Sequence, residues 1–166
     1  MIYGPLQHTV RKIDDLNESN ARIYNLFINS EKDAPLPPEA VYFYVDPRVS
    51  VQRRIPVNLA DVSAQEVAAA HVAALFTPAA SNQRFIVSAG EIASQTISDT
   101  LRANFPELSD RTPIGNPGVS SLPEKASRYS ISNEKSRRVL GIKYRSVEDT
   151  LKELGAQLLE LEKSSN

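Results

Sequence analysis

With 166 residues, 41% of them hydrophobic and 23% charged, the chain has the composition of an ordinary globular protein and the length for one domain with a core. A net charge of −1 argues against nucleic acid or a membrane surface as partner, and the absence of cysteine excludes disulfides and thiolate metal sites. No apolar run approaches the roughly 20 residues that cross a bilayer, and the first residues lack the pattern of a signal peptide. The sequence therefore predicts a soluble, cytoplasmic protein.

The N-terminal part begins with an apolar run, Met1–Pro5, that ends in a Gly-Pro turn, as a strand would. Apolar residues at spacings of three and four then predict an amphipathic helix over Asp14–Ser30, with Asn17 or Ser19 near its N-cap. Prolines make Asp33–Pro38 a loop, because they disrupt both helix and sheet hydrogen bonding.

The β-rich run Val41–Val45 predicts a strand. The stretch that follows, Val49–Gln65, shows neither a helical nor a strand period and is interpreted as an inserted loop. It can be a natural surface loop, which costs a fold little entropy. The favoured interpretation is a short intron retained in frame, because its first, inner and last codons are able to encode splice signals. Without it, the strand would lead directly into the next helix.

An alanine-rich helix is predicted over Ala64–Phe76, and Ser63 with Glu66 forms a capping box at its start. Because His71 lies on the predicted apolar stripe, it is expected to be a core histidine rather than a ligand. That stripe consists of Val67, His71, Ala74 and Leu75.

The next elements are a short buried strand over Gln83–Ser88 and a helix over Ala93–Ala103. Ile97 and Leu101 are expected on the inner face of that helix, which ends before a proline. A loop rich in proline and glycine is predicted over Arg111–Lys125.

The C-terminal part is expected to contain a brief strand, Tyr129–Ile131, and a helix that runs from a cap at Ser132 or Asn133 to a stop at Gly141. Ser146 should cap the last helix, whose apolar stripe is too short for a coiled coil and should pack on its own domain. The stripe consists of Val147, Leu151, Leu154, Leu158 and Leu161, and residues 163–166 are expected to fray.

This order of elements predicts an α/β fold with only three or four short strands and about five helices. Several sequence segments, taken in their order and spacing, resemble those of the dihydroflavonol reductase-like branch of the extended short-chain dehydrogenase/reductases. That branch belongs to the NAD-dependent epimerase/dehydratase family. That branch includes cinnamoyl-CoA, carbonyl and methylglyoxal reductases. These sequence segments are Tyr-Gly-Pro at 3–5, Leu-Asn-Glu-Ser at 16–19, residues 45–48 joined to 66–71, and residues 83–90, 101–108 and 135–150.

The resemblance implies that residues 1–166 form a single, incomplete, C-terminal substrate-binding portion of an NADP-dependent Rossmann-like oxidoreductase. Such enzymes reduce ketones or aldehydes to alcohols. The implied partners are a small carbonyl substrate and the missing Rossmann half. The residues implied to line the cofactor site are Met1, Ile2, Tyr3, Gly4, Pro5, Asn17 and Ser19. Gly4 and Pro5 can also be read simply as a turn, and Asn17 and Ser19 as helix caps.

The catalytic motifs of that family are absent from the chain. Gly115 and Gly118 have the spacing of a phosphate-binding turn, but Ser121 takes the third glycine's place. None of the six tyrosines is followed by lysine four residues later, and Tyr44 has Arg48 there instead. We therefore expect no catalytic residue here, and whether the chain is an enzyme by itself is left open.

Two further site types are weighed on composition. With two histidines and no cluster at ligand spacing, no metal site is expected. A small basic group near a helix end is read as surface rather than as a nucleic-acid site. The alternative to a reductase portion is a non-catalytic interaction module that binds a partner through exposed apolar surface. Exposure is expected on Phe85–Val87 and on the helix at Ala64–Phe76.

Overall fold

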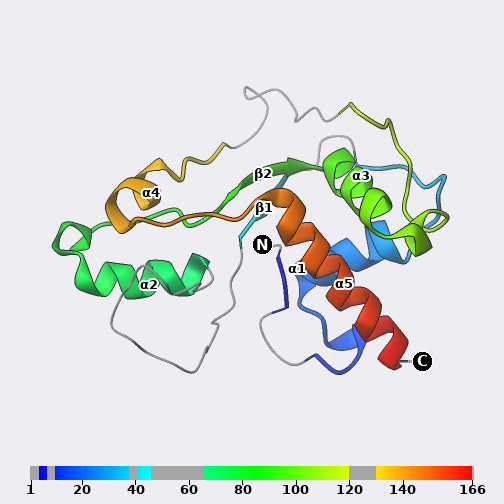
Figure 1. Ribbon diagram of the computed structural model, residues 1–166, viewed down its shortest axis with the longest axis horizontal. Helices are drawn as coiled ribbons and strands as arrows, with labels where there is room; N and C mark the ends of the chain where they lie inside the picture. The colour runs from blue at the N-terminus through cyan, green and yellow to red at the C-terminus, as the bar shows by residue number, and fades with distance from the viewer. Residues whose placement is uncertain (1–3, 7–9, 38–40, 46–65, 120–129, 166) are drawn as a thin grey trace.

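The structure is a computed structural model, and it describes residues 4–6, 10–37, 41–45, 66–119 and 130–165. Its elements form two lobes, each with its own hydrophobic cluster (Figure 1). The main lobe contains α1 (Glu18–Ile23), the π-helix η2 (Tyr24–Ile28), β1 (Val41–Tyr44), β2 (Gly90–Ala93), α3 (Ser94–Asn104) and α5 (Val147–Ser165). The small lobe contains α2 (Glu66–Phe76), the 3₁₀ turn η3 (Pro78–Ala80), the extended residues 81–87, α4 (Glu134–Leu140) and residues 141–144.

The strands β1 and β2 form a two-stranded antiparallel sheet at the centre of the molecule, with Val41 opposite Ala93 and Tyr44 opposite Gly90 (Figure 1). The strand expected at Val41–Val45 is thereby confirmed. The strand expected at Gln83–Ser88 is wrong, because the residues that pair with β1 begin at Gly90. Strand pairing, rather than the local apolar run, decides where the second strand lies.

The first helix starts later than its periodicity suggests. A 3₁₀ turn, Ile13–Asp15, precedes it, and the α-helix begins after Asn17, whose Oδ1 accepts a hydrogen bond from the backbone N–H of Asn20 at 2.8 Å. Asn17 is therefore the N-cap, one of the two residues expected for that role. The same helix continues directly into the π-helix.

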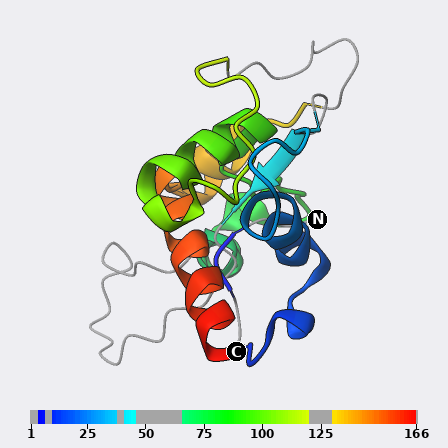
Figure 2. The ribbon, with the colours of Figure 1, turned by 90° about the vertical axis from the view of Figure 1, so that its right-hand side faces the viewer.

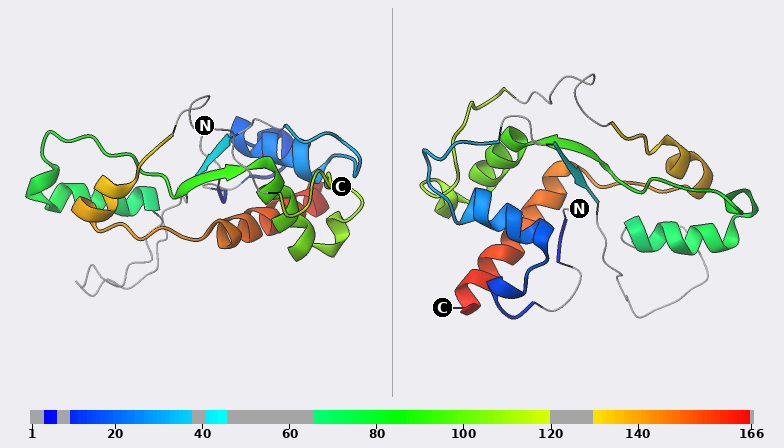
Figure 3. Two further views of the ribbon diagram at one scale, coloured as in Figure 1. Left: turned by 90° about the horizontal axis from the view of Figure 1, so that it is seen from above. Right: turned by 180° about the vertical axis from the view of Figure 1, so that it is seen from behind.

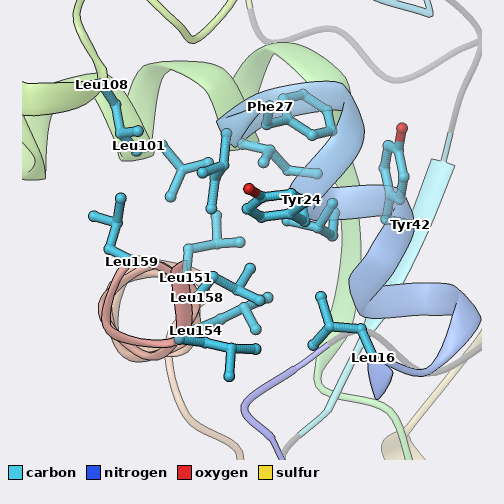
Figure 4. Packing of buried hydrophobic residues seen from close by; sticks show 14 of the residues in the cluster. Leu16, Tyr24, Phe27, Tyr42, Leu101, Leu108, Leu151, Leu154, Leu158 and Leu159 are labelled. Atoms are coloured by element: carbon cyan, nitrogen blue, oxygen red, sulfur yellow. The ribbon is translucent and has the colours of Figure 1, made fainter. Parts of the chain in front are cut away.

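The last helix, α5, packs its leucine stripe into the main core, as expected (Figure 4). Ser146 Oγ accepts the backbone N–H of Asp149 at 3.0 Å, so Ser146 caps the helix as expected. The helix also lies close to α3, since a Cβ added at Gly155 would stand only 3.0 Å from Leu101 Cδ2 of α3 (Figure 2). The expected fraying is wrong for Lys163–Ser165, which continue the helix.

Helix α3 begins and ends one residue later than predicted. Ile97 and Leu101 are fully buried, as expected for its inner face. The following loop crosses over α3, and Thr112 Oγ1 donates a hydrogen bond to the carbonyl of Phe27. This bond ties the loop to the π-helix on the other side of the core. The described part of the predicted loop, Arg111–Val119, contains no helix or strand.

The small lobe differs from expectation in the face that α2 buries. Its packed side consists of alanines, whose small side chains let α4 approach closely. His71 is exposed, and its Nδ1 lies 2.7 Å from the carbonyl oxygen of Val67. Leu75 is 81% exposed. The expectation of a core histidine is therefore wrong. The alanines of the packed side are Ala69, Ala70, Ala73 and Ala74.

Helix α4 ends as predicted at Gly141, which adopts the left-handed conformation (φ +68°) that glycine tolerates best. The strand expected at Tyr129–Ile131 is wrong for Ser130 and Ile131, which are not in a strand, while Tyr129 lies outside the described residues. From above, α2 and α4 lie together at one end of the molecule (Figure 3).

The described residues thus contain five α-helices and two short strands, which confirms an α/β protein with few strands. The interpreted insertion, Val49–Gln65, lies outside them. Within the described ranges, no helix is long and apolar enough to cross a membrane.

Candidate functional site

The residues expected to line a cofactor site fall on two segments that border the main core. Met1, Ile2 and Tyr3 lie outside the described residues. Gly4 and Pro5 are buried, and the backbone N–H of the next residue, Leu6, donates to Gln157 Oε1 of α5 at 2.8 Å. This bond attaches the first described segment to the last helix.

Asn17 and Ser19 lie at the start of α1. The side chain of Asn17 is used in capping, and Ser19 is buried at 7% exposure. Leu6 and Leu16, the neighbours of Pro5 and Asn17, both pack against the main hydrophobic cluster, so the two segments meet the same core. Whether their polar groups face a ligand stays a prediction.

Asn20 is the polar residue that sequence analysis missed in this region. It is 1% exposed, and its Oδ1 has no hydrogen-bond partner among the described residues. An unpaired buried amide oxygen costs free energy. Asn20 lies on α1, three residues after the N-cap Asn17, and only its burial in the tertiary structure distinguishes it.

Tyr24, Tyr44 and Tyr144 do not have the properties of a proton donor for carbonyl reduction. Burial raises the pKa values of Tyr24, Tyr44 and Tyr144, and neighbouring glutamates raise them further. A tyrosine acid near neutral pH needs the opposite shift. Tyr24 instead donates a hydrogen bond to Glu162 Oε1 at 2.7 Å.

Glu162 holds three parts of the main lobe together. Arg111 donates two hydrogen bonds, of 2.6 and 3.0 Å, to the Glu162 carboxylate, and Tyr24 of the π-helix donates a third. The hydrogen bond from Arg111 is the main cause that lowers the pKa of Glu162, and the bond from Tyr24 lowers it further. This cluster has the chemistry of a structural ion pair rather than of a catalytic acid.

A pH dependence follows from this cluster. The folded state lowers the pKa of Glu162, so the ionised carboxylate stabilises the folded protein at neutral pH. That stabilisation is lost as the pH falls through the lowered pKa, in the acid range. Replacing Glu162 with glutamine should lower the free energy of unfolding by about 1 kcal/mol or less at pH 7. The difference in unfolding free energy between the two proteins should shrink below pH ~4. Urea unfolding of both proteins from pH 3 to 7 measures it. A difference that does not change with pH would contradict the assignment.

A second polar cluster joins the two lobes. Glu66, at the start of α2, is 3% exposed, and its Oε1 accepts the backbone N–H of Arg145 at 2.5 Å. Nearby, the Tyr144 hydroxyl lies 2.8 Å from Ser136 Oγ, and the Arg137 guanidinium lies 4.7 Å from the centre of the Tyr144 ring. Sequence analysis read Glu66 only as a capping residue, because Arg145 is distant in the chain.

A surface cavity of about 310 Å³ lies where the segment before α4 crosses β2. The Glu91 carboxylate in its wall accepts the backbone N–H of Ile131 at 2.9 Å, and Asn133 Nδ2 donates to the carbonyls of Ser88 and Ala89. These bonds fasten the segment to the sheet. The cavity therefore does not bring together an acid and a base for catalysis.

The two glycines with phosphate-turn spacing do not fit a dinucleotide. Gly115 and Gly118 have positive φ values, but the side chain of Gln95 occupies the space in front of Gly115. The backbone N–H of Asn116 donates to Gln95 Oε1, and that of Gly118 donates to the Asp99 carboxylate. A carboxylate at this position repels phosphate, so no NADPH phosphate cradle is found here.

The described residues also contain no group of His, Cys, Asp and Glu side chains that could hold a metal ion. The described ranges thus provide a helical scaffold with buried polar groups at the start of α1.

Proteins with similar sequences include reductases. The chain is 31% identical over 160 residues to ketoreductase azaE of Aspergillus niger, a match that covers 96% of this chain and 41% of that protein. It is 32% identical over 101 residues to the NADPH-dependent methylglyoxal reductase GRE2 of Saccharomyces cerevisiae, covering 61% of this chain and 29% of that protein. No family model matches the chain.

Solved structures show the same fold. The yeast methylglyoxal/isovaleraldehyde reductase Gre2, solved with NADPH, aligns with a TM-score of 0.68 at 24% identity, over 96% of this chain and 44% of that one. Gre2 from Candida albicans aligns with a TM-score of 0.69 at 22% identity, over 96% and 42%. The chain thus spans about two fifths of the length of these proteins. Together with the sequence matches, this shows that the chain belongs to the extended short-chain dehydrogenase/reductases, in the dihydroflavonol reductase-like branch of NADPH-dependent reductases.

Proposed function

We propose that this chain is the C-terminal, substrate-side portion of an NADPH-dependent reductase that converts ketones or aldehydes to alcohols. The observation that carries the proposal is the similarity to a ketoreductase over 96% of this chain, although the chain spans only 41% of that relative. NADPH supplies the hydride in such enzymes, and the proposed partner that binds it is a Rossmann-type cofactor part.

The contribution of this chain is to shape the substrate side of the pocket. We assign that role to Met1, Ile2, Tyr3, Gly4 and Pro5 on the first segment and to Asn17 and Ser19 on α1. The burial of Gly4, Pro5 and Ser19 supports a rigid wall, and the unpaired oxygen of Asn20 offers an acceptor beside it. A rigid wall that orients a small carbonyl compound contributes to catalysis without taking part in proton transfer.

The chain alone should neither bind NADPH tightly nor reduce an aldehyde, because its sequence contains no glycine-rich phosphate motif and no Tyr-x-x-x-Lys pair. We expect a dissociation constant for NADPH weaker than about 1 mM, which corresponds to about 4 kcal/mol of binding free energy. NADPH fluorescence titration and an absorbance assay with methylglyoxal test this, with yeast Gre2 as the positive control. Saturable micromolar binding would overturn the prediction.

A non-catalytic interaction module is the second candidate, and the exposure of Leu75 (81%) and Phe76 (73%) favours it. Hydrodynamic size and unfolding separate the two. A purified chain that is monomeric and unfolds cooperatively would support an independent module. A chain that aggregates until a cofactor part is added would support the reductase portion.

A further inference from the structure

Charge is divided unevenly between the two lobes. The small lobe, residues 66–87 and 130–145, contains six basic and two acidic residues, which gives a formal net charge of +4. The described residues of the main lobe contain eight basic and fourteen acidic residues, which gives a formal net charge of −6. The small lobe lies at one end of the long axis of the molecule (Figure 1). Positive potential is therefore concentrated at that end, which the net charge of −1 for the whole chain hides.

The last turn of α4 and the segment after it carry three exposed cations, Arg137, Arg138 and Lys143, which we call the basic surface. Lys143 points away from the small-lobe core, because its neighbours Ile142 and Tyr144 both pack into that core. Among the described residues, the side chains of Arg138 and Lys143 have no ion-pair or hydrogen-bond partner. Two of the three charges are thus open to an anion from outside.

The third cation of the basic surface, Arg137, is held in place by its neighbours. Its guanidinium lies 4.7 Å from the centre of the Tyr144 ring, and its Nε donates a hydrogen bond to Asn133 Oδ1 at 3.0 Å. The two terminal nitrogens of the guanidinium make no hydrogen bond to a described residue. A guanidinium fixed in this way loses little conformational freedom when it binds a carboxylate.

A role in helix stability accounts for only part of the basic surface. Arg137 and Arg138 lie in the last turn of α4, where a cation stabilises the helix dipole by about 1 kcal/mol or less. That interaction does not neutralise either charge. It also does not account for Lys143, which lies beyond the end of the helix.

We propose that the basic surface binds a short acidic segment of a partner protein. One helical turn followed by three extended residues spans roughly 10–15 Å, the length of about four residues of an extended peptide. A nucleic acid carries negative charge over a longer distance, and its phosphates would meet the main lobe, whose net charge of −6 repels them. A few neighbouring carboxylates therefore complement this surface better than a long polyanion does. The inference is independent of the proposed function.

The test titrates the full chain into fluorescein-labelled hexaglutamate and follows fluorescence anisotropy at about 50 and about 300 mM NaCl. We expect saturable binding that weakens about tenfold between the two salt concentrations, because exposed charges are screened. Hexaglutamine should not bind. Labelled hexathymidylate, which has a similar charge on phosphates, should bind more weakly than hexaglutamate.

Two double variants with the same loss of charge make the test specific. Arg138→Gln combined with Lys143→Gln removes two charges from the basic surface and leaves the contacts of Arg137 intact. It should weaken hexaglutamate binding about fivefold or more. Arg11→Gln combined with Lys12→Gln removes two exposed, adjacent cations from the main lobe and should change binding by less than about twofold. Circular dichroism of each variant verifies that the fold is retained.

Each other result would overturn the proposal. No saturable binding at low salt would show that the basic surface is not a docking site. Equal weakening by the two double variants would show attraction to the overall charge of the chain rather than to this surface. Tighter binding of hexathymidylate than of hexaglutamate would assign the surface to nucleic acid instead.

Discussion

Replacing Leu158 with alanine should lower the free energy of unfolding by about 3 kcal/mol. Leu158 is fully buried in α5, in the row of leucines that faces α1 and α3 across the main core (Figure 4). Truncation removes apolar contacts and leaves a cavity between helices that cannot collapse freely. Urea unfolding, monitored by far-UV circular dichroism, measures the change.

The matched control is Leu75→Ala, which deletes the same atoms from a side chain that is 81% exposed. Its effect on the isolated chain should stay within about 0.5 kcal/mol. Equal effects of the two substitutions would show that α5 does not dock on its own domain. They would thereby contradict the packing that both the leucine spacing and the structure indicate.

Replacing Glu66 with alanine should lower the free energy of unfolding by about 2 kcal/mol, because it removes the acceptor of a buried backbone N–H. Glu66 is 3% exposed, and its bond to Arg145 connects the start of α2 to the segment that leads into α5. We expect faster hydrogen exchange at the Arg145 amide and a lower unfolding midpoint. Glu66→Gln keeps an acceptor oxygen, so it should lower the free energy of unfolding by less than Glu66→Ala does.

Glu160→Ala serves as the control, since Glu160 is an exposed glutamate on α5. Its removal should change stability by no more than about 0.5 kcal/mol. If Glu66→Ala unfolds like the control, with unchanged exchange at Arg145, the two lobes are not joined through this carboxylate. The apolar contacts of the small lobe would then account for their arrangement.

The elements that sequence analysis located well have strong local signals. The capping pair Ser146 and Asp149, the leucine spacing of α5 and the stop at Gly141 each depend on residues within a few positions of one another. Asn17 was one of two candidate caps, and its Oδ1 bond to Asn20 selects it. Hydrogen bonds between near neighbours can be recognised in a sequence because the same few residue types always make them.

The candidate site was predictable only in part. Family resemblance pointed to Gly4, Pro5, Asn17 and Ser19, and the structure brings their segments to one core without testing their roles. Asn20 carried no signal in the sequence, because an asparagine in a helix is usually exposed. Its burial arises from the packing of α1 against the rest of the main lobe.

The sequence by itself determined the positions of α3, α4 and α5, the first strand and the resemblance to the reductases, since helix caps, periodicity and motifs are local. Tertiary structure alone decided that the second strand begins at Gly90, that α2 packs through its alanines and leaves His71 exposed, and that Glu66 joins the lobes. The reason is that strand pairing, the choice of a buried face and a bond across 79 positions depend on partners far away in the chain.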